Sequence, residues 1–249
     1  MAIYITADLH GSNDIKKLSA TLFPNQKELT KNDFVIILGD FGLIWSDEET
    51  KEETYWLDWL NSRNFTTLFI DGNHDNHNKL ASFPVNEWHG GRVHFIRPSV
   101  IHLMRGQVFD IEELKFFTMG GARSHDIWDG ILEVDDPRLK NWYKDPYKMF
   151  RVRNVDWWDA EMPSEAEFDE GIINLAKNDF KIDYILTHSP SMTEMTLMHY
   201  KEKSNPLMTY IDDIMTKTDF KRHYFGHMHI DKQISYNGIC LYNKIERII

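Results

Sequence analysis

Cysteine is nearly absent from this chain. Cys240 is the only cysteine among 249 residues, so no disulfide can form within the chain. A protein that needs no internal disulfide fits a reducing compartment. Cys240 follows Gly238 and Ile239 in an expected strand, which favours a buried, unreactive thiol.

Long apolar runs are also missing. No stretch approaches the roughly 20 apolar residues that span a bilayer. Residues 1–7 are apolar, but Asp8 and His10 interrupt them and no basic region precedes them, so a secretory signal is not expected. We therefore expect a cytoplasmic protein with no membrane partner.

Positive charge is in deficit. The chain has 28 Lys and Arg against 39 Asp and Glu, a net charge of -11, and two bound divalent cations would still leave it acidic. Long-range attraction to nucleic acid is therefore not favoured, although a local basic patch stays open. We expect a small-molecule partner rather than a long nucleic acid; the sequence does not indicate an oligomeric state.

The periodicity of apolar residues changes along the chain. Strands are expected at residues 2–7, 34–38, 66–71, 183–187 and 222–226, short hairpin strands between 93 and 118, and closing strands within 232–248. Helices are expected at about 14–22, from a capping box at Ser46–Glu49 to about 61, and at about 163–178, 191–200 and 206–217. This order predicts an α/β or α+β fold with one mixed sheet or two packed sheets.

Residues 123–163 form the least regular region. They include the tryptophans Trp128, Trp142, Trp157 and Trp158, together with three prolines. A flexible linker would not carry so many tryptophans, so we expect a structured insertion or lid in a single domain over residues 1–249.

Five expected strands run into residues that can bind metals. The blocks are Asp8-Leu9-His10, Gly39-Asp40, Gly72-Asn73-His74-Asp75, Thr187-His188 and Gly226-His227-Met228-His229. Ligands bind at the carboxyl edge of open α/β sheets. Each block alone also fits an ordinary turn or a buried histidine. Their occurrence in order, each after an apolar strand, favours one shared site.

Oxygen and nitrogen donors make up the candidate metal ligands: Asp8, His10, Asp40, Asn73, His188, His227 and His229. Side chains at i and i+2 on a strand end face one side, so Asp8 and His10 can share an ion. Asp40 can bridge two ions through its two oxygens. The set suits Mn²⁺, Fe, Zn²⁺, Ni²⁺ or Mg²⁺ and argues against a structural zinc site. Two ions about 3.5–4 Å apart are a known device for phosphoryl transfer.

The five blocks resemble the pattern of the calcineurin-like metallophosphoesterase superfamily, which is D-x-H, G-D, G-N-H-D/E, H and G-H-x-H. The resemblance spans Asp8 to His229. It implies two packed mixed β-sheets flanked by helices, a four-layer sandwich. It also implies a metal-dependent phosphoesterase that hydrolyses phosphate mono- or diesters with an activated water or hydroxide and two divalent ions, manganese being favoured.

The resemblance also assigns roles to residues. It implies a first ion held by Asp8, His10 and His229, a second held by Asn73, His188 and His227, and Asp40 between them. His74 would stabilise the transition state or protonate the leaving oxygen. Asp75 would orient His74 through a hydrogen bond.

Departures from the pattern indicate which branches of the superfamily the chain resembles less. Asp40 is followed by Phe41-Gly42-Leu43, and His74 by Asp75, unlike the protein serine/threonine phosphatases of the superfamily. Leu43 stands where purple acid phosphatases place a tyrosine. The form of the third block resembles phosphodiesterases, nucleases and many small bacterial phosphatases.

Substrate contacts are expected from the loop after Gly120-Gly121. Arg123 or His125 there could contact a substrate phosphate, and a salt-bridged insertion is the open alternative. Two alternatives to a small-ester phosphoesterase also stay open: a nuclease of the same superfamily, and a catalytically inactive scaffold on this fold.

Overall fold

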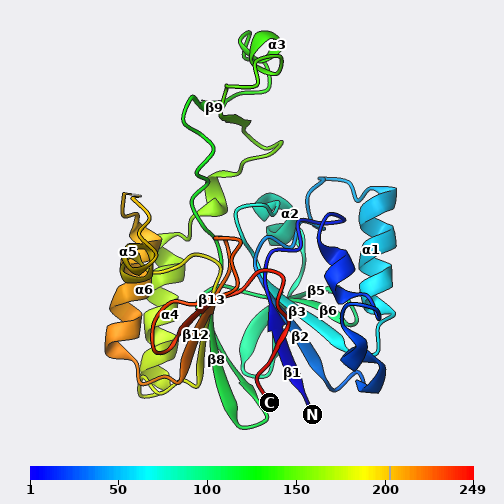
Figure 1. Ribbon diagram of the computed structural model, residues 1–249, viewed down its shortest axis with the longest axis vertical. Coiled ribbons are helices and arrows are strands. Elements are labelled where there is room, and N and C mark those ends of the chain that lie inside the picture. The colour runs from blue at the N-terminus through cyan, green and yellow to red at the C-terminus, as the bar shows by residue number, and fades with distance from the viewer. Residues whose placement is uncertain (202) are drawn as a thin grey trace.

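Two mixed β-sheets pack face to face in the computed structural model, which describes residues 1–201 and 203–249 (Figure 1). The first sheet has the order β15-β1-β2-β3-β6-β5-β4. Its strands are β1 (Ile3–Thr6), β2 (Phe34–Leu38), β3 (Thr66–Ile70), β4 (Val85–Trp88), β5 (Gly91–Arg97), β6 (Val100–Leu103) and β15 (Glu246–Arg247). β1, β2, β3 and β6 are parallel, so their carboxyl ends share one edge.

The second sheet has the order β13-β14-β12-β11-β8-β7. Its strands are β7 (Gln107–Ile111), β8 (Leu114–Met119), β11 (Tyr184–Thr187), β12 (Arg222–Phe225), β13 (Lys232–Gln233) and β14 (Gly238–Cys240). β8, β11, β12 and β14 are parallel. The short strands expected at 93–118 and 232–248 are all present.

Helices cover the outer face of each sheet (Figure 1). The helices are α1 (Lys51–Asn61), α2 (His77–Ser82), α3 (Leu139–Trp142), α4 (Glu165–Lys177), α5 (Met192–Leu197) and α6 (Pro206–Lys217). Short 3₁₀ helices are η1 (Ile15–Leu18), η2 (Pro24–Glu28) and η3 (Asp159–Glu161). None of the helices in the described part of the chain combines the length and apolar character that crossing a bilayer requires.

Alternation along the strands divides the core into layers. Ile3 and Ile5 of β1 lie in the apolar core between the two sheets, whereas Tyr4 lies in the core beneath α1. Because side chains alternate across a strand, β1 is buried on both faces, which explains its continuous apolar run. A third core joins the second sheet to α4 and α6. The predicted sandwich of helices, two mixed sheets and helices is confirmed.

Two local predictions are wrong. The helix expected at 14–22 is only the 3₁₀ turn η1, because the side chains of Asp14 and Lys17 are held by distant groups rather than following helical packing. The capping box lies at Thr50 and Glu53, not at Ser46–Glu49, and the helix begins at Lys51.

Residues 123–163 project as an arm from the edge where the parallel strands end (Figure 1). The arm contains the parallel pair β9 (Gly130–Leu132) and β10 (Phe150–Val152), with α3 at its tip. Trp128 in the arm is 84% exposed, whereas Trp158 at the base is buried and its ring lies 5.0 Å from that of Trp45. That the arm acts as a lid stays a prediction.

A buried ionic cluster ties the strand ends of the first sheet to the base of the arm. Asp71, directly after β3, accepts hydrogen bonds from Arg105 Nε and Nη2 at 2.9 and 2.6 Å and lies 3.1 Å from His102 Nε2. Arg105 lies in the turn between β6 of the first sheet and β7 of the second, and it also donates to the carbonyl of Ala160 at the arm base. Burial disfavours a charged Asp71, but Arg105 and His102 hold its pKa well below the usual range.

We expect Arg105→Met to lower the free energy of unfolding by about 3–5 kcal/mol at neutral pH, because Asp71 would be left buried without its cation. The depressed pKa of Asp71 means that its contribution is present above the unfolded-state value of 3.8 and is lost as pH falls below it. The deficit of the variant should therefore shrink in acid. Urea unfolding at neutral and acid pH measures it, with Arg247→Met as an exposed control; a loss below about 1 kcal/mol would contradict the cluster's role.

Candidate metal centre

Left-handed backbone turns place the ligands just beyond the strand ends. β1 ends at Thr6, and Asp8 and His10 have φ values of 54° and 45°; Asp40, His227 and His229 have 46°, 66° and 51°. Non-glycine residues rarely adopt such angles, and those that do cluster at functional sites. The expectation that strand alternation aligns Asp8 with His10 is therefore wrong, because both follow the strand in turn conformations.

Glycines allow the strand ends to approach. Gly39 has φ of 76°, and a Cβ there would collide with the ring of His188. A Cβ on Gly72 would collide with the backbone and carboxylate of Asp40. Both positions therefore require glycine so that the Asp40 and His188 turns can meet.

The first group of donor atoms belongs to Asp8, His10, Asp40 and His229, all within 4.8 Å of one another. His10 Nε2 lies 3.3 Å from Asp40 Oδ2, and His229 Nε2 lies 3.4 Å from Asp8 Oδ1. Asp8 also accepts from the backbone N–H of His227 at 3.1 and 3.2 Å, which joins the first and last strand ends of the site.

The second group shares Asp40 with the first and adds His188 and His227. His188 Nε2 lies 3.1 Å from Asp40 Oδ1 and 3.3 Å from Asn73 Oδ1. The two oxygens of Asp40 thus face different imidazoles, which is the arrangement a bridging carboxylate requires. The structure brings all seven predicted ligands together at one edge.

The chemistry of these donors fits divalent cations. Asp8 is fully buried and Asp40 is 1% exposed, so two carboxylates share a site from which solvent is largely excluded. Their charges need compensation, and oxygen and imidazole donors suit first-row transition ions. The geometry therefore supports a metal site, with Asp40 common to both groups.

Outer hydrogen bonds orient two of the imidazoles. His10 Nδ1 lies 3.0 Å from Asp14 Oδ2, and His188 Nδ1 lies 2.8 Å from the carbonyl oxygen of Leu38. Such bonds leave Nε2 of each ring free to face a metal. Asp14 was not among the predicted site residues, although its position four residues after His10 is a usable signal; the contact of the Leu38 carbonyl has no signature in the sequence.

Lys17 and Tyr242 support the first group from behind. The Lys17 ammonium donates to the carbonyls of Asp8 and Tyr242 at 2.9 and 2.7 Å, and to that of Ala7. The Tyr242 ring stacks on His229 with centroids 4.8 Å apart. Burial lowers the pKa of Lys17 to about 8. These contacts join segments far apart in the chain, so local sequence patterns could not indicate them.

Charge coupling centres on Asp40. Burial opposes its ionisation, but His188 and hydrogen bonds from His10 and His188 hold its pKa well below the usual range. Burial and the neighbouring His188 keep the pKa of His227 well below 6.5, so His227 offers a neutral ring. Metal ions bind ionised carboxylates and neutral imidazoles, so Asp40 and His227 are already in those states; His188, whose pKa Asp40 raises to about 10 against the effect of burial, would lose a proton when a metal binds.

His74 lies at a cavity of about 400 Å³ beside the first group, also lined by Trp45, Asn13 and Tyr242. Its ring stacks on Trp45, with centroids 6.1 Å apart and planes 17° apart. Burial lowers its pKa, and Arg151 of the arm lowers it further against the opposing effect of Asp40. A neutral His74 can donate an N–H to a bound phosphate ester.

Asp75 does not act as expected. Its carboxylate accepts from the backbone N–H groups of Phe41, Gly42 and Gly72 at 3.2, 2.8 and 2.8 Å, and no bond joins it to the His74 ring within the described residues. Burial and Asp40 raise its pKa to about 8, while the amides favour the charged form. Asp75 therefore holds together the turns that follow β2 and β3. The side chain that contacts the His74 ring is that of Trp45, which was not among the predicted site residues.

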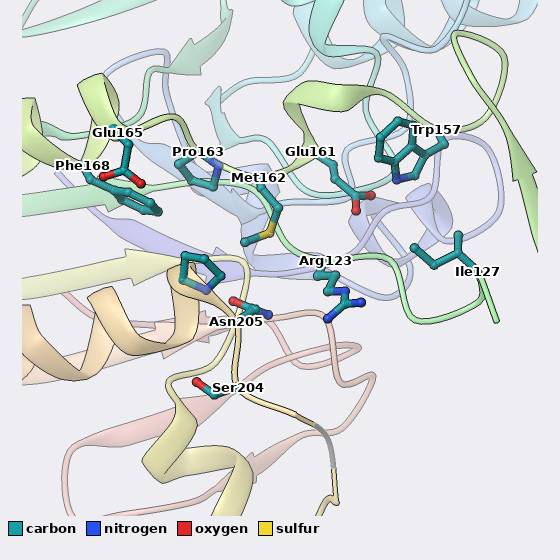
Figure 2. A pocket seen from close by; sticks show the side chains of 11 residues that line it. Arg123, Ile127, Trp157, Glu161, Met162, Pro163, Glu165, Phe168, Ser204 and Asn205 are labelled. Atoms are coloured by element: carbon teal, nitrogen blue, oxygen red, sulfur yellow. The ribbon is translucent and has the colours of Figure 1, made fainter. Parts of the chain in front are cut away.

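The two expected substrate contacts separate in the structure. The ring of His125 lies 5.8 Å from that of His227, at the metal centre. Arg123 instead lines a different cavity, shown in Figure 2, and does not line the cavity beside His74. A contact between Arg123 and the phosphate at the metal centre is therefore not supported, because the loop turns His125 toward His227 and Arg123 toward a separate cavity.

A two-sheet α/β fold that gathers carboxylates and imidazoles at parallel strand ends defines a class of metal-dependent hydrolases. A protein-family model described as calcineurin-like phosphoesterase matches residues 1–231. The chain therefore belongs to the calcineurin-like phosphoesterase family and is, in general terms, a metal-dependent phosphoesterase. No match was found among curated proteins.

We expect Mn²⁺ to stabilise the metal-depleted protein by about 2.7 kcal/mol at 100 times its dissociation constant, because the folded donor groups bind the ion and the unfolded chain does not. Asp40→Asn should remove most of this gain, since both donor groups share Asp40. Thermal unfolding with and without Mn²⁺ measures it, and Asp213→Asn, at an exposed position of α6, is the matched control. Equal stabilisation of both variants would contradict the assignment.

Proposed function

We propose that the protein hydrolyses small phosphate mono- or diesters at a centre of two divalent ions, with manganese favoured. The observation that carries the proposal is Asp40, whose two oxygens lie 3.3 and 3.1 Å from His10 and His188 of different donor groups. One carboxylate serving two groups of ligands is suited to a pair of ions.

Residues of the chain supply the rest of the chemistry. When bound, the ions activate water or hydroxide as a nucleophile and neutralise the charge of the phosphate. Asp8, His10 and His229 would hold one ion and Asn73, His188 and His227 the other. His74, kept neutral by burial, donates an N–H hydrogen bond to a phosphate oxygen or to the leaving oxygen and stabilises the negative charge that develops there. Trp45 fixes the plane of that ring.

The preference for small esters rests on the size of the cavity beside His74 and on the net charge of the chain. The cavity beside His74 has about 400 Å³, the volume of a small ligand, and the chain is acidic. A cytoplasmic location is part of the proposal and is supported by the buried, single cysteine.

We expect His74→Asn to lower kcat for 4-nitrophenyl phosphate or its bis-aryl diester by about 10²- to 10³-fold, the usual cost of removing one preorganised hydrogen-bond donor to developing charge. Metal content should stay at the wild-type level, because His74 is outside both donor groups. His199→Asn, an exposed histidine, is the matched control.

Full activity of His74→Asn would refute the catalytic role of His74. A wild-type protein that binds ions but hydrolyses no phosphate ester would instead support the inactive scaffold.

The proposal also predicts the salt dependence of any nuclease activity. Because the protein is acidic, cleavage of a single-stranded DNA oligonucleotide should be slow and should rise with ionic strength, as salt screens repulsion. Hydrolysis of bis(4-nitrophenyl) phosphate in the same buffers corrects for any effect of salt on the activity of the metal centre itself. Faster DNA cleavage at low salt would indicate phosphate contacts by a basic surface and favour a nuclease.

A further inference from the structure

A second cavity lies at the base of the arm. It has about 380 Å³ and is lined by residues of the arm and of the N-terminal ends of α4 and α6 (Figure 2). Its residues differ entirely from those of the cavity beside His74. No role in the metal centre accounts for it.

Asn205 presents an unpaired donor in this cavity. The side chain is 5% exposed, and its Oδ1 caps α6 by accepting the N–H of Met208 at 3.0 Å. Its Nδ2 is buried and has no hydrogen-bond partner in the part of the chain that the structure describes. A buried donor without an acceptor is costly, so the site calls for an acceptor from a ligand.

Arg123 adds a positive charge to the same cavity. Its side chain is exposed, and no ion pair joins it to a carboxylate of residues 1–201 or 203–249. In Figure 2 the amide of Asn205 points toward the side on which the Arg123 guanidinium lies. Two donors thus line one space, and neither is paired with an acceptor of the described chain.

The N-terminal end of α6 strengthens the preference for a negative group. This 12-residue helix begins with Pro206 and has no acidic residue in its first turn. Its positive dipole end is therefore uncompensated where it meets the cavity.

Two acidic residues also line the cavity, but within the described residues neither is paired with Arg123 or with Asn205 Nδ2. Glu161 Oε1 and Oε2 accept from the backbone and hydroxyl of Ser124, and burial raises the pKa of Glu161. Glu165 is an exposed residue in the first turn of α4. The remaining walls are apolar and include Trp157, Met162 and Phe168.

This cavity adjoins the metal centre through one short loop. Arg123 and His125 are two residues apart, so their Cα atoms lie within about 7 Å. The ring of His125 is 5.8 Å from that of His227. Residues 123–125 therefore span the distance from the metal centre to this cavity, so the two sites lie on the two sides of one short loop.

We propose that this cavity binds a carboxylate or phosphate carried by the leaving group of the ester whose scissile phosphate lies at the metal centre. The apolar walls hold the body of the leaving group, and Arg123 and Asn205 Nδ2 hold its anionic end. The proposal rests on the proposed phosphoesterase activity and adds the class of substrate: an ester with a second, remote anionic group.

The test uses aryl phosphates that carry a carboxylate on the ring or on a side chain of increasing length, each paired with its neutral carboxamide. A parallel series carries a second phosphate in place of the carboxylate. For each pair, kcat/KM with the Mn²⁺-loaded full chain gives an anion preference. At the favoured length we expect wild type to prefer the anionic ester by tenfold or more, as expected for charge-assisted hydrogen bonds.

Variants assign this preference to the cavity. Arg123→Glu and Asn205→Asp should each reduce it about tenfold or more. Asn205→Asp keeps the oxygen that caps α6 and replaces only the unpaired donor. Arg123→Lys should retain part of the preference, and Arg247→Met, an exposed control on β15, all of it.

The outcomes separate this proposal from the function on which it rests. Hydrolysis of neutral esters without any anion preference, or with a preference that both variants keep, overturns the cavity assignment alone. Free benzoate or inorganic phosphate that accelerates neutral esters through Arg123 would also overturn it, because the anion would then act as a separate effector. If no ester of either series is hydrolysed, the proposed phosphoesterase activity is itself wrong.

Discussion

The site depends on the burial of two carboxylates, those of Asp8 and Asp40, at adjoining strand ends. Charges so far from water need partners, and the chain surrounds them with imidazoles whose outer nitrogens are fixed in turn. The left-handed turns and glycines serve the same convergence, because they let the strand ends meet closely enough for shared ions. The conformational strain of the left-handed residues would thus be offset by the charge compensation that bound metal ions provide.

The base of the arm belongs to this site, although its tip projects away from the sheets. Trp158 packs on Trp45, which stacks on His74, so the arm contributes to the position of the His74 ring. Arg151 of the arm, paired with Asp126, acts electrostatically on His74. Arg105 fastens the arm to the strand end at Asp71. Changes in the arm can therefore affect the chemistry as well as the choice of substrate.

The sequence was sufficient where the signal was local. Apolar runs such as 34–38 and 66–71 became strands, and the residues that follow them meet at one edge, because parallel strands share that edge. Contacts between residues far apart in the chain could not be predicted from local patterns. They include the stacking of Tyr242 on His229 and of Trp45 on His74, and the backbone amides bound by Asp75. The wrong prediction of a helix at 14–22 also comes from long-range contacts, because the Lys17 ammonium is held by carbonyl groups of other segments.

The central claim is that residues distant in sequence hold a pair of ions through a shared Asp40. Crystals grown with Mn²⁺ and measured at the manganese absorption edge test it most directly. The account predicts two anomalous peaks about 3.5–4 Å apart on either side of the Asp40 carboxylate, one beside His10 and His229 and the other beside His188 and His227. A single peak, or peaks away from Asp40, would contradict it.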